Sequence, residues 1–156
     1  MQRSDSRNRL IEKAKRSRFW LWCLNGVLCR TIPFNRPHRL EVLKITDDSI
    51  EVKIPYRKSN LNHLKGLHAC VLAAASEYAM GFLLISRLNP ARYRLIIQSL
   101  EVSYHFQGKR DSIAKFFLPK DWFEQQVVTP LKVKEAVIVP TEAKVFDSQV
   151  TFAPER

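Results

Sequence analysis

The sequence contains few of the residues that specialised folds require. Only three of its 156 residues are cysteine and four are glycine, and no internal repeat stands out. So few cysteines, in an odd number, exclude a disulfide framework, and we expect Cys23, Cys29 and Cys70 to be reduced and buried in a cytoplasmic chain. The composition is 46% apolar and 26% charged, which excludes a disordered protein and suits one domain.

Several motif classes are also missing. No Cys/His spacing fits zinc, no glycine-rich loop fits a nucleotide, and no serine stands in a nucleophile elbow. We therefore expect no metal and no cofactor. The apolar run at residues 19–29, FWLWCLNGVLC, is far shorter than the roughly 20 residues that span a bilayer. No small-residue cleavage pattern follows it, so we expect no export signal.

Acidic residues are scarce relative to basic ones. The chain has 15 Asp and Glu against 26 Lys and Arg, a formal net charge of +11 at pH 7. Such an excess favours a polyanionic partner: nucleic acid, an anionic membrane face, or a phosphorylated small molecule such as a coenzyme. Nucleic acid ranks lowest, because aromatic residues here mostly occupy core positions of strands instead of alternating with Lys and Arg on an exposed face.

Residues 8–30 have the spacing of an amphipathic helix, with Arg and Lys concentrated in its first half. Two interpretations stay open for this helix. It packs its tryptophans on the domain with a solvated basic face, or it lies at the surface and touches anionic lipid or polyphosphate. The sequence thus divides into a basic N-terminal helical segment, residues 1–34, and a single domain, residues 35–156.

The remaining pattern predicts an α+β domain. Two alternating stretches form a hairpin, an apolar helix follows and ends near Asn89-Pro90, and four more strands come after it. The strands are expected at residues 40–45, 50–56, 95–107, 112–118, 131–139 and 143–152. Because the helix is apolar on all sides, we expect an antiparallel sheet of five to six strands wrapped around it.

The apolar helix carries one ionised side chain, Glu77, at the centre of LHACVLAAASEYAMGFLLI. Burying an unpaired carboxylate is costly, so this residue needs a partner, a raised pKa or a cavity. Two hypotheses stay open. Glu77 is a structural acid paired with an arginine or a backbone amide, or it is a catalytic or substrate-facing group.

Asn62, His68 and Glu77 stand six and nine residues apart, on a loop, at a helix start and in a helix middle. This pattern resembles the hot-dog-fold acyl-CoA thioesterase superfamily, particularly its phenylacetyl-CoA-thioesterase-like group. The order of predicted elements agrees over roughly residues 35–152. The resemblance therefore implies a hot-dog fold, with a long central helix held by an antiparallel sheet.

The resemblance also implies roles for these residues. Glu77 acts as general base or nucleophile at the thioester carbonyl, and Asn62 and His68 complete the catalytic set. The amides at the helix start form an oxyanion hole, where the helix dipole and unpaired N–H groups stabilise negative charge. The implied substrate-binding residues are Gly66, Ala69 and Cys70. Relatives often have two glycines where this chain has Ala69 and Cys70.

Helix geometry adds an expectation about assembly. His68 and Glu77 are about 13 Å apart along the axis and half a turn out of phase, so one helix cannot aim both at one carbon. We therefore expect a homodimer or homotetramer in which Glu77 of one subunit faces Asn62, His68 and the amides of another.

Three functions remain in competition. The leading hypothesis is a thioester hydrolase, with acyl-CoA or a related thioester as substrate and a basic surface that receives the coenzyme phosphates. The second is a non-catalytic acyl-CoA-binding or acyl-binding hot-dog protein, favoured by the missing glycines. The third is a basic peripheral membrane adaptor, favoured by the net charge and the N-terminal helix.

Overall fold

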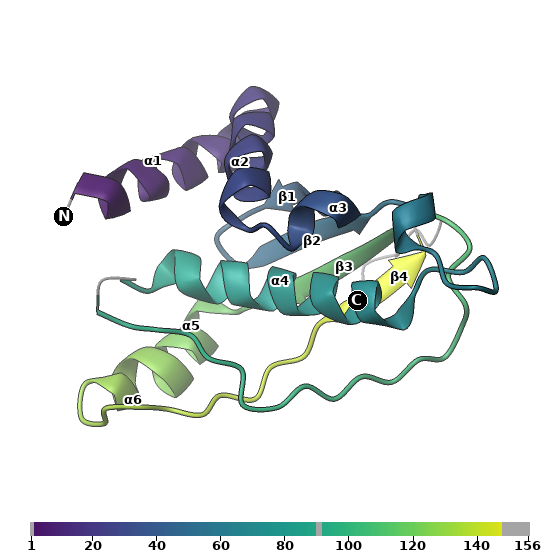
Figure 1. The fold of residues 1–156 in the computed structure, drawn as a ribbon. Helices are drawn as coiled ribbons and strands as arrows, with labels where there is room; N and C mark the ends of the chain where they lie inside the picture. Colours follow the sequence, from purple (N-terminus) through teal and green to yellow (C-terminus); the bar gives the residue numbers. More distant parts are fainter. Residues whose placement is uncertain (1, 90–91, 148–156) are drawn as a thin grey trace, which may run out of the picture.

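The structure, a computed structural model, describes residues 2–89 and 92–147, with side chains from residue 8 onward. Three helices precede a four-stranded sheet, and a long helix connects its second and third strands (Figure 1). The first three helices are α1 (Gln2–Arg16), α2 (Arg18–Thr31) and α3 (Asn35–His38). The strands are β1 (Glu41–Ile45), β2 (Ser49–Ile54), β3 (Ser112–Phe117) and β4 (Lys144–Asp147).

The sheet has the order β1-β2-β3-β4, and every neighbouring pair is antiparallel. Buried and half-exposed residues alternate along β2, so that one face of the strand lies on the core. The buried residues are Ile50, Val52 and Ile54. Val52 lies opposite Val42 of β1 and Ala114 of β3. The predicted hairpin between the first two strands is therefore confirmed.

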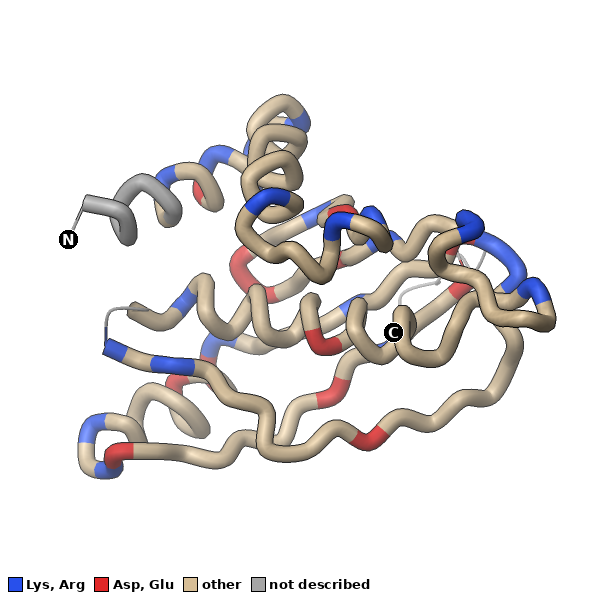
Figure 2. The backbone as a smooth tube through the Cα atoms, in the orientation of Figure 1, with Lys and Arg blue, Asp and Glu red and all other residues tan. Residues whose placement is uncertain are grey.

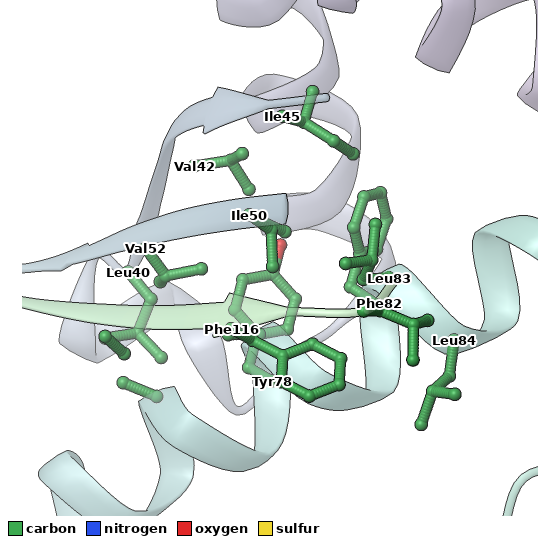
Figure 3. Packing of buried hydrophobic residues seen from close by; sticks show 14 of the residues in the cluster. Leu40, Val42, Ile45, Ile50, Val52, Tyr78, Phe82, Leu83, Leu84 and Phe116 are labelled. Carbon is green, nitrogen blue, oxygen red and sulfur yellow. The ribbon is translucent and has the colours of Figure 1, made fainter. Parts of the chain in front are cut away.

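The long helix is α4 (Ala69–Arg87), which packs against β2 and β3. Its buried Tyr78, Phe82 and Leu83 meet Ile50 and Phe116 of the sheet in one continuous core (Figure 3). By length and composition α4 is also long and apolar enough to cross a membrane, but a core helix has the same properties. The shorter elements are η1 (Lys58–Asn60), α5 (Lys120–Phe123), η2 (Glu124–Val128) and α6 (Thr129–Leu131).

The strand count differs from the prediction of five to six. Over the described residues the sheet has four strands, because residues 95–107 and 131–139 contain no strand and run alongside α4 (Figure 1). Ile96 is 81% exposed and Phe106 is 92% exposed. Alternation predicts that a segment has two unlike faces, but it does not supply a neighbouring strand to bond with. Of the predicted strand at 143–152, residues 144–147 form β4, which pairs with β3; residues 148–152 lie outside the described part.

The N-terminal segment also differs from the prediction of one helix over residues 8–30. Ser17 is extended, with φ −145° and ψ 130°, and separates α1 from α2. The break lets both helices bury apolar side chains in the same core, Ile11 from α1 and Leu24 from α2. It also places Asn25 beside β1, where its side chain accepts from the Val42 N–H at 2.8 Å and donates to the Val42 carbonyl at 2.9 Å.

The three cysteines are free thiols, but they are less buried than predicted. Cys23 and Cys29 are half-buried in α2, and Cys70 is exposed in the first turn of α4. Apolar neighbours in sequence do not bury Cys70, because in the first turn of α4 the buried position is taken by Val71 and Cys70 lies on the exposed side. The prediction of a buried thiol is wrong for this residue.

Candidate functional site

A large open groove lies along the face of α4 that the sheet does not cover. Its volume is about 1760 Å³, and its walls are α4, the extended segment 92–108 and residues 135–147. The groove residues on α4 are Leu72, Ser76, Glu77, Met80, Gly81 and Leu84, and Leu88 follows at the C-cap of the helix. One side of α4 packs on the sheet, and the other side lines this groove. These two surroundings account for a helix that is apolar on all sides without a sheet that encloses it.

Glu77 lies in the middle of this groove wall and is half-buried. Desolvation raises the pKa of its carboxyl above the ordinary value of 4.5. The carboxylate of Glu77 makes no hydrogen bond and no ion pair with any described residue. A structural acid would be paired with an arginine or a backbone amide, and no described residue provides such a partner for Glu77. The carboxylate is instead available to a molecule in the groove.

The backbone next to Glu77 leaves room for its carboxylate. A β-carbon added to Gly81, one turn further along α4, would lie 3.8 Å from Glu77 Oε1 and 3.6 Å from Leu95 Cδ2. Glu77 and the extended segment therefore converge over Gly81. At this point the groove therefore has both an apolar side chain and a carboxylate in its wall.

Asn62 has a local role in the loop before α4. Its Oδ1 accepts from the backbone N–H of Leu64 at 2.9 Å and of Gly66 at 3.0 Å, and its own N–H donates to the Gly66 carbonyl at 2.8 Å. These bonds close a tight turn, an arrangement that asparagine favours. Gly66 is buried, and a β-carbon there would meet the Gln107 side chain at 2.5 Å. Both residues shape the loop in this chain.

His68 is the N-cap of α4. Its Nδ1 accepts from the Cys70 N–H at 3.1 Å, and its own N–H donates to the Asn60 carbonyl at 2.8 Å. The Cys70 amide is thus already bonded. The Ala69 amide has no acceptor among the described residues, as expected for the first N–H of a helix.

The predicted site residues form two groups within one chain. Glu77 lines the groove, whereas Asn62, His68 and Cys70 lie around the start of α4 and are not among the groove residues. The same holds for Gly66 and Ala69. The structure joins Asn62 to Gly66 and His68 to Cys70, but it brings none of these side chains to Glu77.

Two residues that the sequence did not single out hold the segments around the start of α4 in place. Tyr104 lines the groove and its hydroxyl donates to the Ala69 carbonyl at 3.0 Å, so the extended segment is fastened to the start of α4. Burial raises the pKa of Tyr104, and the nearby Cys70 adds to this effect. Its place in an alternating stretch gave no signal for this contact.

Asn60 is the second such residue, and it is 1% exposed. Its Nδ2 donates to the carbonyls of His38 and Pro55, each at 2.9 Å, and its Oδ1 lies 2.9 Å from His38 Nδ1. It therefore connects α3, the end of β2 and the loop before α4. A signal was available, because a buried amide needs several partners, but Asn60 stands only two positions before Asn62 in a polar loop.

The fold is similar to several solved structures. A Pseudomonas aeruginosa protein of unknown function, described as a probable thioesterase, matches with a TM-score of 0.73 and 18% identity, over 80% of this chain and 83% of its own. A Chlorobaculum tepidum protein of unknown function matches with a TM-score of 0.72 and 13% identity, over 93% of this chain and 83% of its own. A Shewanella oneidensis protein described as a candidate thioesterase matches with a TM-score of 0.55 and 16% identity, over 64% of this chain and 74% of its own.

These likenesses confirm the predicted hot-dog fold, and two of the matched proteins are themselves described as thioesterases. No curated protein sequence matches the chain significantly. At the level of sequence family, the model for a domain of unknown function, DUF4442, matches residues 22–153. That match covers most of the chain, which therefore belongs to the DUF4442 family.

Proposed function

We propose that this protein hydrolyses an acyl-CoA or a related thioester, with Glu77 as general base or nucleophile. The observation that carries the proposal is the position of Glu77, a carboxylate with a raised pKa and no partner among the described residues, in the wall of a large groove. A carboxylate with a raised pKa is a better proton acceptor for water near neutral pH. The solved thioesterase-like proteins of the same fold support the reaction class.

The groove supports this substrate class chemically. Leu72, Met80 and Leu84 of α4 provide an apolar wall beside Glu77, suited to an acyl chain. Arg92 and Arg94 line the same groove beyond the C-terminal end of α4 and suit the phosphates of a coenzyme. We place the acyl chain along α4 and the coenzyme phosphates near these arginines, with the reaction in the cytoplasm, where free thiols persist.

We further propose that the complete site is shared between two subunits of a homodimer or homotetramer. Within one chain His68 and the Ala69 amide lie apart from Glu77, and the Ala69 N–H at the helix start has no acceptor among the described residues. A two-fold axis between antiparallel copies of α4 would bring Glu77 of one subunit to the helix start of the other. There the amide would stabilise the oxyanion, with the partner subunit's Asn62 and His68 beside it.

A subunit-mixing experiment tests the shared site. Glu77→Gln and Asn62→Ala subunits, each inactive alone, should recover part of the activity when exchanged, because some mixed dimers regain one intact site. Mixing each variant with itself is the control. A monomer in solution, or no recovery despite confirmed exchange, would reject the shared site while leaving Glu77 as the base untouched.

The reaction itself is tested by a hydrolysis screen against short, medium, long and aromatic acyl-CoAs. Wild type is compared with Glu77→Gln and with Glu135→Gln, which alters another groove carboxylate. We expect turnover of at least one class by wild type and by Glu135→Gln, and a strong loss for Glu77→Gln. Equal rates for all three proteins would reject Glu77 as the reacting group.

A non-catalytic acyl-binding protein is the second candidate function, and one observation favours it. The Cys70 N–H is bonded to His68, and the Gly66 N–H is bonded to Asn62. Fewer N–H groups are therefore available to an oxyanion than two glycines with free N–H groups at positions 69 and 70 would provide. Under this alternative, acyl-CoA binds wild type and Glu77→Gln equally well, and neither protein releases free CoA.

A further inference from the structure

Helix α2 has two apolar faces, and the core uses only one of them. Leu24 is buried and Leu28 packs beside it against the core, whereas Phe19 is 62% exposed and Trp22 is 71% exposed. At 100° per residue, Phe19 and Trp22 lie roughly opposite Leu24 and Leu28 on the helix. Figure 1 shows α1 and α2 standing away from α4. The exposed fractions of Phe19 and Trp22 show that the described elements leave this outer face largely uncovered.

The exposed apolar side chains of α2 lie close together. The rings of Phe19 and Trp22 have centroids 6.2 Å apart. Burial in the core accounts for Leu24 and Leu28 but not for these residues. A contiguous exposed apolar surface on a helix marks a site of interaction.

The charge around this face has one sign. Residues 13–40 contain no Asp or Glu and seven cations: Lys13, Lys15, Arg16, Arg18, Arg30, Arg36 and Arg39. Lys15 is paired with Glu12 and with Asp47, and Arg16 also lies near Asp47. By contrast, Arg18 and Arg30 form no ion pair with any described carboxylate. Figure 2 shows blue and no red along α2.

We propose that this basic aromatic surface, formed by Phe19, Trp22, Arg18 and Arg30, binds the surface of an anionic lipid bilayer. Exposed tryptophan and phenylalanine partition into the boundary between headgroups and acyl chains, and flanking arginines are attracted to anionic headgroups. A second copy of the same surface would bring cations against cations, which disfavours self-association. The proposal does not depend on any reaction at Glu77.

The test is sedimentation of the full chain with vesicles of phosphatidylcholine alone, or containing about one third phosphatidylserine. We expect binding to the anionic vesicles only, weakening as ionic strength rises because the arginine contribution is screened. Phe19→Ser/Trp22→Ser should lower the partition coefficient by on the order of tenfold or more, since apolar insertion is lost. Arg18→Gln/Arg30→Gln should weaken binding and reduce its salt dependence.

Matched controls alter equivalent residues elsewhere. Phe117→Ser removes a 65% exposed phenylalanine from β3, and Lys120→Gln/Lys134→Gln removes two exposed cations outside α2; neither should change binding. Because all altered side chains are exposed, unchanged thermal unfolding confirms that each variant is folded. The proposal is overturned if Phe19→Ser/Trp22→Ser binds as well as wild type, or if wild type binds neutral and anionic vesicles equally well. Conversion of an oligomer to a monomer by that replacement, without vesicle binding, assigns the surface to self-association and equally overturns it.

Discussion

The two faces of α4 are built from the same kinds of residue but have different surroundings. On one face Ala75, Ala79 and Leu83 have almost no exposure and pack in the core with the sheet. On the other face Leu72 and Met80 line a groove together with Glu77. The comparison teaches that an apolar helix can hold a fold together along one side while presenting a binding wall along the other. Changes on the two faces should therefore affect different properties.

The largest expected effect comes from Glu77→Gln on the groove face. We expect hydrolysis to fall by on the order of 100-fold or more, because general-base catalysis is lost. The free energy of unfolding at neutral pH should stay the same or rise, because a desolvated carboxylate without a partner is removed. Rates for the best acyl-CoA and chemical denaturation measure the two properties. A variant that is both inactive and strongly destabilised would break the separation of the two faces.

The next effect comes from Leu83→Ala on the core face. Leu83 is 1% exposed, so its truncation should lower the free energy of unfolding by about 2–5 kcal/mol. Met80→Ala, on the half-exposed groove face, is the matched control and should cost clearly less. Urea denaturation of both variants checks this. Equal losses would mean that the groove closes around Met80 in solution.

A pH series sharpens the comparison further. The folded-state pKa of Glu77 is raised, so between the unfolded and folded pKa values the unfolded chain binds fewer protons than the native protein. The free energy of unfolding of wild type, relative to Glu77→Gln, should therefore fall as pH rises through this window and level off above it. Over the same window kcat/KM should rise, because the carboxylate is the active form. A pH-independent difference between the two proteins would contradict the raised pKa.

The smallest effect is expected for Gly81→Ala, next to Glu77 on the groove face. The new β-carbon would make ordinary contacts with Leu95 and Glu77, and alanine should stabilise the helix by about 0.5–1 kcal/mol. The hydrolysis rate should change little. A large loss of rate with a gain in stability would show that substrate approaches this stretch of α4 at the distance of a glycine.

The sequence predicted the parts of the fold that depend on local pattern. The alternation of Ile50, Val52 and Ile54 located the second strand, and the apolar run located α4 and the groove-facing Glu77. The break at Ser17 could not be predicted in this way, because both halves keep a helical spacing and only packing against β1 requires them to diverge.

Long-range partners are what the pattern could not supply. Residues 95–107 have the alternation of a strand but no strand neighbour among the described residues, since pairing depends on which segments meet in space. For the same reason Asn62, chosen by spacing, closes a local turn, while Asn60 holds three distant segments together. The exposure of Cys70 likewise depends on which residue of the first turn of α4 packs in the core, and that residue is Val71.

The bonds from Asn25 to both backbone groups of Val42 close the outer edge of the sheet at this point of β1. An amide side chain offers a donor and an acceptor as a peptide group does, so α2 terminates the outer edge of β1 at this point without adding a strand. Another chain cannot extend the sheet past β1 without first displacing Asn25.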